Sequence, residues 1–272
     1  MSHDVRTPIN GIQGCVDIAD RYPDDLKLQQ EARTKIRTAS GYLLNLVNDV
    51  LDMNKLESGN IQLERKHFNL LEVLHNTNEI IRVQANESGV NYYVEDGEII
   101  HTQLIGSPVH FQQILMNIGS NAVKYNHDGG SVTVTCREVS YTDTTAEYEL
   151  TCTDTGISMS EEFQKRAFEP FAQEGQSART KYAGTGLGLA IAKKLIELQG
   201  GTLFFESIQG KGTKFILHIS FEISAEEQEK KSHMYQNCSV EGVQVLLVED
   251  NELNMEIAEF LLKEEKMKVT KA

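Results

Sequence analysis

The sequence lacks several features that would each have indicated a particular class of protein. No apolar run approaches the ~20 residues of a membrane-spanning helix, and we expect no signal peptide at Met1. The four cysteines show no paired metal-binding spacing, so free thiols in a reducing, cytoplasmic compartment are expected. Positive charge is scarce: the formal net charge of −14 argues against a nucleic-acid partner and against contact with an anionic membrane. A parent protein anchored in a membrane through a missing N-terminal region is left open.

The pattern of polar and apolar residues changes three times along the chain. The 272 residues are enough for one large or two modest globular domains. A helical segment comes first, followed by a mixed α/β segment, a charged and polar linker, and a short final segment that begins with a buried-type strand and continues as a helix. These predicted segments are residues 1–66, 67–222, 223–242 and 243–272.

The first two segments predict different architectures. A helix over residues 2–20 and a longer one after the turn at 22–25 carry apolar residues at spacings near three and four, which indicates an amphipathic hairpin that needs a partner. The second segment mixes helices with strands of alternating polarity. The clearest of its elements are helices over 69–87 and 108–125, strands over 131–139 and 147–153, and a helix that ends at Gly200-Gly201. Cys136 and Cys152 fall on the apolar side of these strands, as small core residues.

The helix over residues 108–125 carries a polar stripe. At ~100° per residue, Asn117, Asn121 and Lys124 share one narrow face, while the apolar residues lie a quarter to half a turn away. An asparagine oxygen can ligate Mg²⁺, and a lysine is a suitable point charge for phosphates. A solvated polar face explains the helix alone equally well.

Two glycine-containing motifs follow. Residues 154–156 (DTG) come directly after a strand, and residues 184–189 (GTGLGL) open a helix, where free N–H groups suit a phosphate. Such clusters often serve only turns. The order of elements disfavours a Rossmann site, and the Walker pattern is absent.

Residues 2–8 (SHDVRTP) start the first helix. Taken alone, they are best explained structurally, with Ser2 as N-cap, Asp4 favourable to the helix dipole and His3 exposed. Pro8 would free the carbonyl of Asp4 and bend the helix.

The set of motifs is more specific than any one of them. In order along the chain stand residues 3–8 (HDVRTP), 117–125 (NIGSNAVKY), 154–156 (DTG), 168–171 (FEPF) and 184–189 (GTGLGL). Together they resemble the H, N, first glycine, F and second glycine boxes of histidine kinases. Residues 210–215 resemble the closing glycine box, so the resemblance covers about residues 1–221. The sequence departs from the family at Ser158, usually a second glycine, and at Ser107, usually acidic.

The resemblance implies a role for each matching residue. His3 is the phosphorylated histidine, and Asp4 orients its imidazole and stabilises the developing positive charge. Asn121 ligates Mg²⁺, Asp154 accepts a hydrogen bond from the adenine amino group, and residues 172–185 form a mobile ATP lid. The implied ATP-binding residues are Asn117, Asn121, Lys124, Tyr125, Asp154, Gly156, Arg179, Lys181, Gly184, Gly186, Leu187, Gly188 and Thr213.

The implied fold is α+β: a helical-hairpin dimerisation element, then an α/β sandwich of the type shared with gyrase and heat-shock chaperone ATPases. The resemblance also implies ATP-dependent autophosphorylation on His3, with transfer to an aspartate in the receiver domain of a response regulator. The expected assembly is a homodimer through the hairpin, weakened because little of the first helix precedes His3. A nucleotide-binding scaffold without kinase activity is the competing interpretation, and a gyrase- or chaperone-type ATPase is disfavoured by residues 3–8.

The end of the chain resembles the start of a receiver domain. Residues 245–251 (VLLVEDN) combine an apolar strand with an acidic pair, Glu249 and Asp250, which in that family helps to hold Mg²⁺. The acceptor aspartate would lie beyond Ala272. We therefore expect a truncated α/β element that cannot be phosphorylated by this chain.

Overall fold

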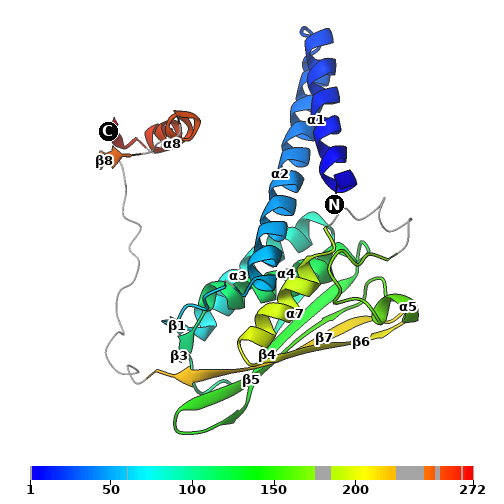
Figure 1. Cartoon of the computed structure of the whole chain (residues 1–272), viewed down its shortest axis with the longest axis vertical. Coiled ribbons are helices and arrows are strands. Elements are labelled where there is room, and N and C mark those ends of the chain that lie inside the picture. Colours follow the sequence, from blue (N-terminus) through cyan, green and yellow to red (C-terminus); the bar gives the residue numbers. More distant parts are fainter. Residues whose placement is uncertain are drawn as a thin grey trace. The chain divides into compact units, whose positions relative to one another are not determined.

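The computed structural model describes residues 2–59, 61–174, 185–224, 242–248, 252–264 and 266–271. The chain divides into two compact units, Met1–Glu226 and Glu227–Ala272. The first contains a helical hairpin and an α/β sandwich (Figure 1).

The hairpin consists of α1 (Ser2–Arg21) and α2 (Leu26–Glu57). Asp25 caps α2, because its side chain accepts hydrogen bonds from the N–H groups of Lys27 (3.1 Å) and Leu28 (3.0 Å). The Gln29 side chain donates to the Ala19 carbonyl at 2.6 Å and so ties the second helix to the end of the first. The prediction of two helices is confirmed, and Pro8 lies inside α1 without ending it.

The sandwich follows with seven strands and four helices among the described residues. In chain order they are β1 (Lys66–Asn69), α3 (Leu70–Glu87), β2 (Asn91–Asp96), β3 (Gln103–Gly106), α4 (Pro108–Lys124), β4 (Ser131–Tyr141), β5 (Thr145–Asp154), α5 (Glu161–Gln164), α7 (Gly188–Leu198), β6 (Thr202–Ile208) and β7 (Gly212–Ile223). The sheet order is β1-β3-β7-β5-β4-β2, and β6 pairs with β7. All pairs are antiparallel except β2 with β4. The predicted α/β sandwich is confirmed.

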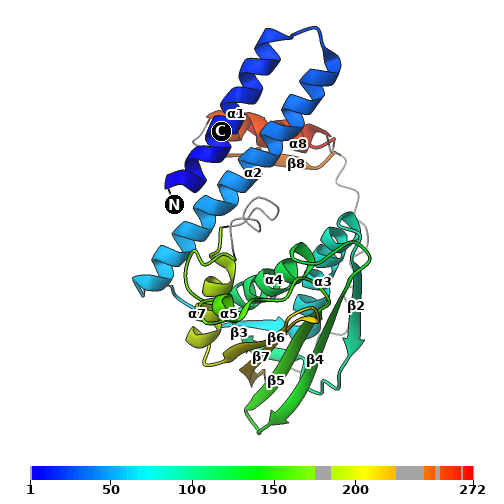
Figure 2. The same ribbon diagram turned by 90° about the vertical axis from the view of Figure 1, so that its right-hand side faces the viewer.

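Helices α3, α4 and α7 cover one face of this sheet (Figure 2). Alternation along the strands directs one side chain in two toward these helices, and both Cys136 and Cys152 are buried there, as expected. Phe221 of β7 joins the layers, with its ring centroid 5.2 Å from that of Phe68 and 5.3 Å from that of Phe111. The core therefore fixes α4 firmly against the sheet.

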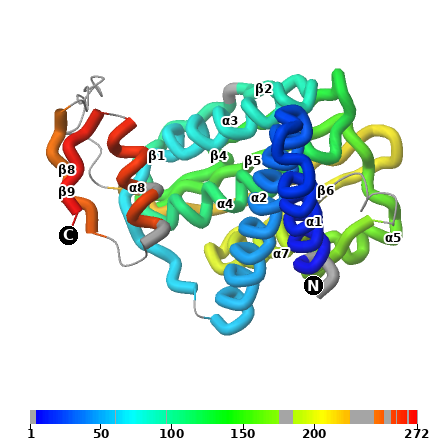
Figure 3. The backbone as a smooth tube through the Cα atoms, turned by 90° about the horizontal axis from the view of Figure 1, so that it is seen from above, coloured from blue at the N-terminus to red at the C-terminus, as the bar shows by residue number. Residues whose placement is uncertain are grey.

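The end of α2 joins the same core. Leu56 is 4% exposed and belongs to the hydrophobic cluster of the sandwich. The Gln113 side chain of α4 donates to Asp52 of α2 at 2.7 Å. Seen from above, α2 lies over the helical layer (Figure 3). The hairpin thus packs on the helices of the sandwich.

The second unit contains β8 (Gln244–Leu247), α8 (Glu252–Glu264) and β9 (Lys268–Lys271). The predicted strand and helix are present, but the strand is not buried: Leu246 is 65% exposed. Strands β8 and β9 pair in parallel and form a two-stranded sheet, which the sequence did not predict. None of the described helices combines the length and apolar character needed to cross a membrane.

Candidate functional site

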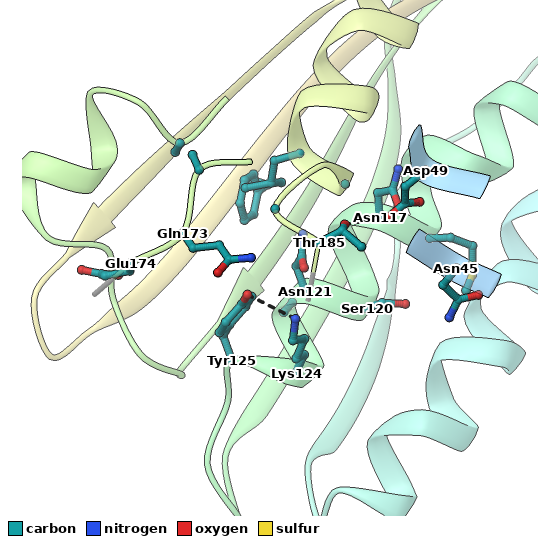
Figure 4. Close-up of a pocket in the computed structure, with 18 of the residues that line it drawn as sticks. Asn45, Asp49, Asn117, Ser120, Asn121, Lys124, Tyr125, Gln173, Glu174 and Thr185 are labelled. Atoms are coloured by element: carbon teal, nitrogen blue, oxygen red, sulfur yellow. Dashed lines mark hydrogen bonds between the residues drawn. The ribbon is translucent and has the colours of Figure 1, made fainter. Parts of the chain in front are cut away.

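A cavity of about 800 Å³ opens between α4, the start of α7 and the middle of α2 (Figure 4). Its volume is within the range of small-molecule sites. Eight of the sequence-predicted residues line it: Asn117, Asn121, Lys124, Tyr125, Asp154, Gly186, Gly188 and Thr213. Residues far apart in the sequence are therefore brought to one place.

Helix α4 supplies one wall because its two faces differ. Phe111, Ile114 and Ile118 are at most 5% exposed and hold the helix on the sheet, which leaves the polar stripe facing the cavity. The Asn117 Nδ2 position is buried, with no hydrogen-bond partner among the described residues. A buried amide without a partner is costly, so a ligand atom at this position would stabilise the site.

Lys124 and Tyr125 stand at the C-terminal end of this stripe. The Lys124 Nζ donates to the Tyr125 hydroxyl at 3.2 Å and lies 4.7 Å from the centroid of its ring. Burial lowers the pKa of Lys124. Burial and the nearby charge of Glu174 raise the pKa of Tyr125. The ammonium is thus desolvated and close to an aromatic ring, where it can meet an anionic ligand.

Asp154 ends β5 at the far end of the cavity and is 5% exposed. Its Oδ1 accepts from the N–H groups of Gly156 at 2.8 Å and Thr213 at 3.3 Å. Burial raises its pKa to about 6, and the two N–H groups partly oppose that shift. A side chain at Gly156 would collide with the Tyr125 carbonyl at 2.4 Å, so close packing on α4 requires a glycine there.

The start of α7 closes the opposite end. Gly186 has a φ of +72°, and a Cβ there would lie 2.8 Å from the Ala172 carbonyl, so only glycine fits easily. A Cβ at Gly188 would lie 3.4 Å from the Asn117 Oδ1 and 3.9 Å from the Asn121 Nδ2. The first turn of α7, with its unsatisfied N–H groups, therefore faces the amides of α4.

Sequence reasoning missed a wall contributed by the hairpin. Asn45, Asn48, Asp49 and Asp52 recur on one face of α2 and line the cavity. The Thr185 hydroxyl donates to the Asp49 Oδ2 at 2.6 Å and accepts from the Leu187 N–H at 3.2 Å. Burial and the charge of Asp52 raise the pKa of Asp49, while the Thr185 bond lowers it. The polar spacing of three and four along α2 was the available signal.

Several predicted residues are not in the lining. Leu187 is fully buried in the hydrophobic core, and Gly156 packs on α4. His3 and Asp4 belong to α1, but their side chains are outside the described part of the structure. Five other predicted residues fall outside the described residues altogether: Arg179, Lys181, Gly184 and the receiver-like pair Glu249 and Asp250.

The described lining is acidic. Its charged groups are four carboxylates and two ammonium groups: Asp49, Asp52, Asp154, Glu174, Lys55 and Lys124. Within the described ranges, no three His, Cys, Asp or Glu side chains gather as a metal site. Amide oxygens and oxygens of the ligand itself are further donors that a cation could use here.

Two family descriptions match this architecture. Residues 106–223 match "Histidine kinase-, DNA gyrase B-, and HSP90-like ATPase", and residues 1–59 match "His Kinase A (phospho-acceptor) domain". The chain belongs to the histidine kinase family. It is 33% identical over 264 residues to the autoinducer 2 sensor kinase/phosphatase LuxQ of Vibrio cholerae, a match that covers 95% of this chain and 30% of LuxQ. The chain thus spans less than a third of the length of that relative.

Solved structures share the fold. Full-length ShkA in complex with AMPPNP matches all of this chain over 54% of its own length, with a TM-score of 0.61 and 24% identity. Histidine kinase ThkA in complex with the response regulator protein TrrA matches 84% of this chain over 61% of its own length, with a TM-score of 0.60 and 22% identity. The hairpin followed by an α/β ATPase sandwich is the architecture of two-component histidine kinases.

Proposed function

We propose that this chain is an ATP-dependent protein-histidine kinase that phosphorylates His3 and passes the phosphoryl group to a receiver aspartate. The observation that carries the proposal is the cavity, in which the polar stripe of α4, the start of α7 and Asp154 converge. The same unit includes the hairpin helix that bears His3. The AMPPNP complex of ShkA, a protein of the same fold, supports ATP as the ligand.

The chemistry assigned to His3 is a direct phosphoryl transfer. One nitrogen of the neutral imidazole attacks the γ-phosphorus of ATP, and an N–P bond forms as the bond to the β,γ-bridging oxygen breaks and ADP leaves. Asp4 accepts a hydrogen bond from the other ring nitrogen, which fixes the tautomer and stabilises the cation until its proton is lost. In-line positioning and charge stabilisation do most of the catalytic work in such transfers.

The two ends of the cavity suit the two ends of ATP. Asp154 and Thr213 face the base, and Tyr125 lies against it. Lys124 and the N–H groups at Gly186 and Gly188 face the phosphates. Three further phosphate contacts are assigned to Arg179, Lys181 and Gly184.

Mg²⁺ fits the phosphate end. Asn121 is the protein ligand that we assign to it, with Asn117 beside it, because amide oxygens suit this hard cation. Bound Mg²⁺ would neutralise charge on the β- and γ-phosphates. The excess of carboxylates in the described lining gives a physical reason for requiring such a cation.

The proposed partners are a second copy and a receiver domain. Leu44, Val47 and Leu51 follow one another at heptad spacing on α2 and are 43–61% exposed, which suits packing against an identical hairpin. The ThkA–TrrA complex supports a response regulator as the acceptor. We assign the second unit, with its parallel β8–β9 pair and Glu249 and Asp250 after β8, to the start of a receiver.

The test is direct. After incubation with Mg-ATP, mass spectrometry should find one acid-labile, base-stable phosphoryl group, on His3. His3→Gln should bind ATP normally and incorporate none, whereas Asn10→Ala, an exposed change on the same helix, should behave as the parent does. A parent that binds ATP without incorporation would leave a nucleotide-binding scaffold as the function.

A further inference from the structure

The base end of the cavity is formed where two chain segments meet. Asp154 and Thr213 are directly paired across β5 and β7. The loop after β5 (residues 155–160) and the turn between β6 and β7 (residues 209–211) both leave the sheet at this point, beside α5 (Figure 1). A Cβ at Gly212 would lie 1.9 Å from the Asp154 carbonyl, so the two segments are in tight contact.

Ser158 links the loop to the turn. Its hydroxyl donates to the Ile208 carbonyl at 2.7 Å and accepts from the Gly212 N–H at 3.1 Å. The Ile208 carbonyl also accepts from the Lys211 N–H at 2.9 Å, which closes the turn. Ser158 is the residue that departs from the glycine usual in the family, and a glycine could make neither side-chain bond.

Ser207 makes a second link and reaches the cavity lining. Its hydroxyl oxygen accepts from the Met159 N–H at 2.9 Å, lies 3.0 Å from the Thr213 hydroxyl and donates to the Gly212 carbonyl at 3.3 Å. A serine hydroxyl has one proton. If the Ser207 proton goes to the Gly212 carbonyl, the bond between the two hydroxyls uses the proton of Thr213, and the experiment below tests this direction.

The direction of this bond decides whether the Thr213 hydroxyl acts as a donor or as an acceptor toward a ligand. With its own proton committed to Ser207, the Thr213 oxygen presents lone pairs to the cavity. Asp154, its neighbour across the strands, is likewise an acceptor when ionised. Two acceptors side by side favour a base edge that donates, such as the 6-amino group of adenine, over one with a 6-oxo group.

We infer that Ser207 and Ser158 are positioning residues that make the base end of the cavity selective for a 6-amino purine. Ser207 sets the hydroxyl direction of Thr213, and Ser158 holds the turn that carries Gly212 and Thr213 against the loop after Asp154. This inference rests on the proposed binding of ATP in this cavity, and it adds which residues control the choice of base.

The experiment compares Mg-ATP with Mg-inosine triphosphate, which has a 6-oxo group, on the full chain by calorimetry. The parent should bind ATP more tightly, and Ser207→Ala should reduce that preference about fivefold, the effect of one hydrogen bond, because the freed Thr213 hydroxyl can then donate to the oxo group. Ser158→Ala should reduce it less, and Ser207→Thr should retain it. The matched control is Ser140→Ala, which removes a serine hydroxyl of β4 that donates to the Glu147 side chain of β5.

A purely structural role would lower the unfolding temperature and leave the preference unchanged. The inference is therefore overturned if Ser207→Ala keeps the parent's ratio of the two dissociation constants, or if the parent shows no preference. If Ser207→Ala does not fold, Ser207→Cys, with its weaker hydrogen bonding, is read in the same way. In a Thr213→Val background, Ser207→Ala should have no further effect on the ratio. A parent that binds neither nucleotide refutes the proposed function instead.

Discussion

The two ends of the cavity are constructed differently. At the base end, Asp154, Ser158 and Ser207 bond largely to backbone groups of one domain, at 2.7–3.3 Å. At the phosphate end, side chains of α4 face side chains of α2, and the Thr185 hydroxyl, which precedes α7, bonds to the Asp49 side chain of the hairpin. Backbone bonds fix position, whereas contacts between side chains on separate helices can change when the helices move.

This difference suits the proposed function, in which the base is held in place and a phosphoryl group is transferred. The base end belongs to the sheet, whose register is fixed along ten paired residues of β5 and β7. The phosphate end depends on how the hairpin packs. Changes at the two ends should therefore have distinguishable effects, and the following predictions test that.

The largest effect is expected from Asn121→Ala at the phosphate end. Loss of an oxygen ligand for the cation should weaken Mg-dependent ATP binding by about 10- to 100-fold, the usual range for a bond to a charged group. Calorimetry with and without Mg²⁺ measures this. Asn54→Ala, an exposed asparagine of α2 outside the cavity, should change nothing. An equal loss of ATP affinity with and without Mg²⁺ would contradict the metal assignment.

A smaller, pH-dependent effect is expected at the base end. Because burial raises the pKa of Asp154 from 3.8 to about 6, its ionisation costs the free protein stability as the pH rises between these values. Only the carboxylate presents two acceptors to an amino group, so ATP affinity should rise about tenfold from pH 5 to pH 7. The Asp154→Asn variant should not show this rise in ATP affinity. Titration of the ATP phosphates affects both proteins and cancels in the comparison. Identical pH profiles would exclude Asp154 as the titrating group.

The smallest effect is expected from Asp49→Asn. The amide keeps an oxygen that can accept from Thr185 but removes a negative charge from the wall that faces the phosphates. ATP affinity should increase about two- to fivefold at low salt, and less at high salt because ions screen the interaction. Asp17→Asn on the exposed side of α1 is the charge-matched control. An increase in affinity that does not depend on salt would rule out a charge effect.

Much of the fold follows from local pattern. The hairpin, the helices α3, α4 and α7, and the long strands β4 and β5 all lie close to their predicted positions. Each carries a clear period, and several have an end signal such as Asp25 or Gly200. The pairing of β8 with β9 was missed, since β9 (Lys268–Lys271) is short and mostly polar. Its structure depends on a partner strand that the local sequence does not reveal.

The candidate site likewise has parts that the sequence predicts and parts that it does not. The sequence by itself determined the polar stripe of α4, the glycines at the start of α7 and the acid at the end of β5, because helical and strand periods place such residues on definite faces. Only the tertiary structure decided that α2 forms a wall and that Ser158 and Ser207 secure the base end. Asp49 and Thr185 are 136 residues apart, and Ser158 is 50 residues from Ile208. Contacts over such separations arise from the packing of whole helices and strands, for which a single sequence contains no local signal.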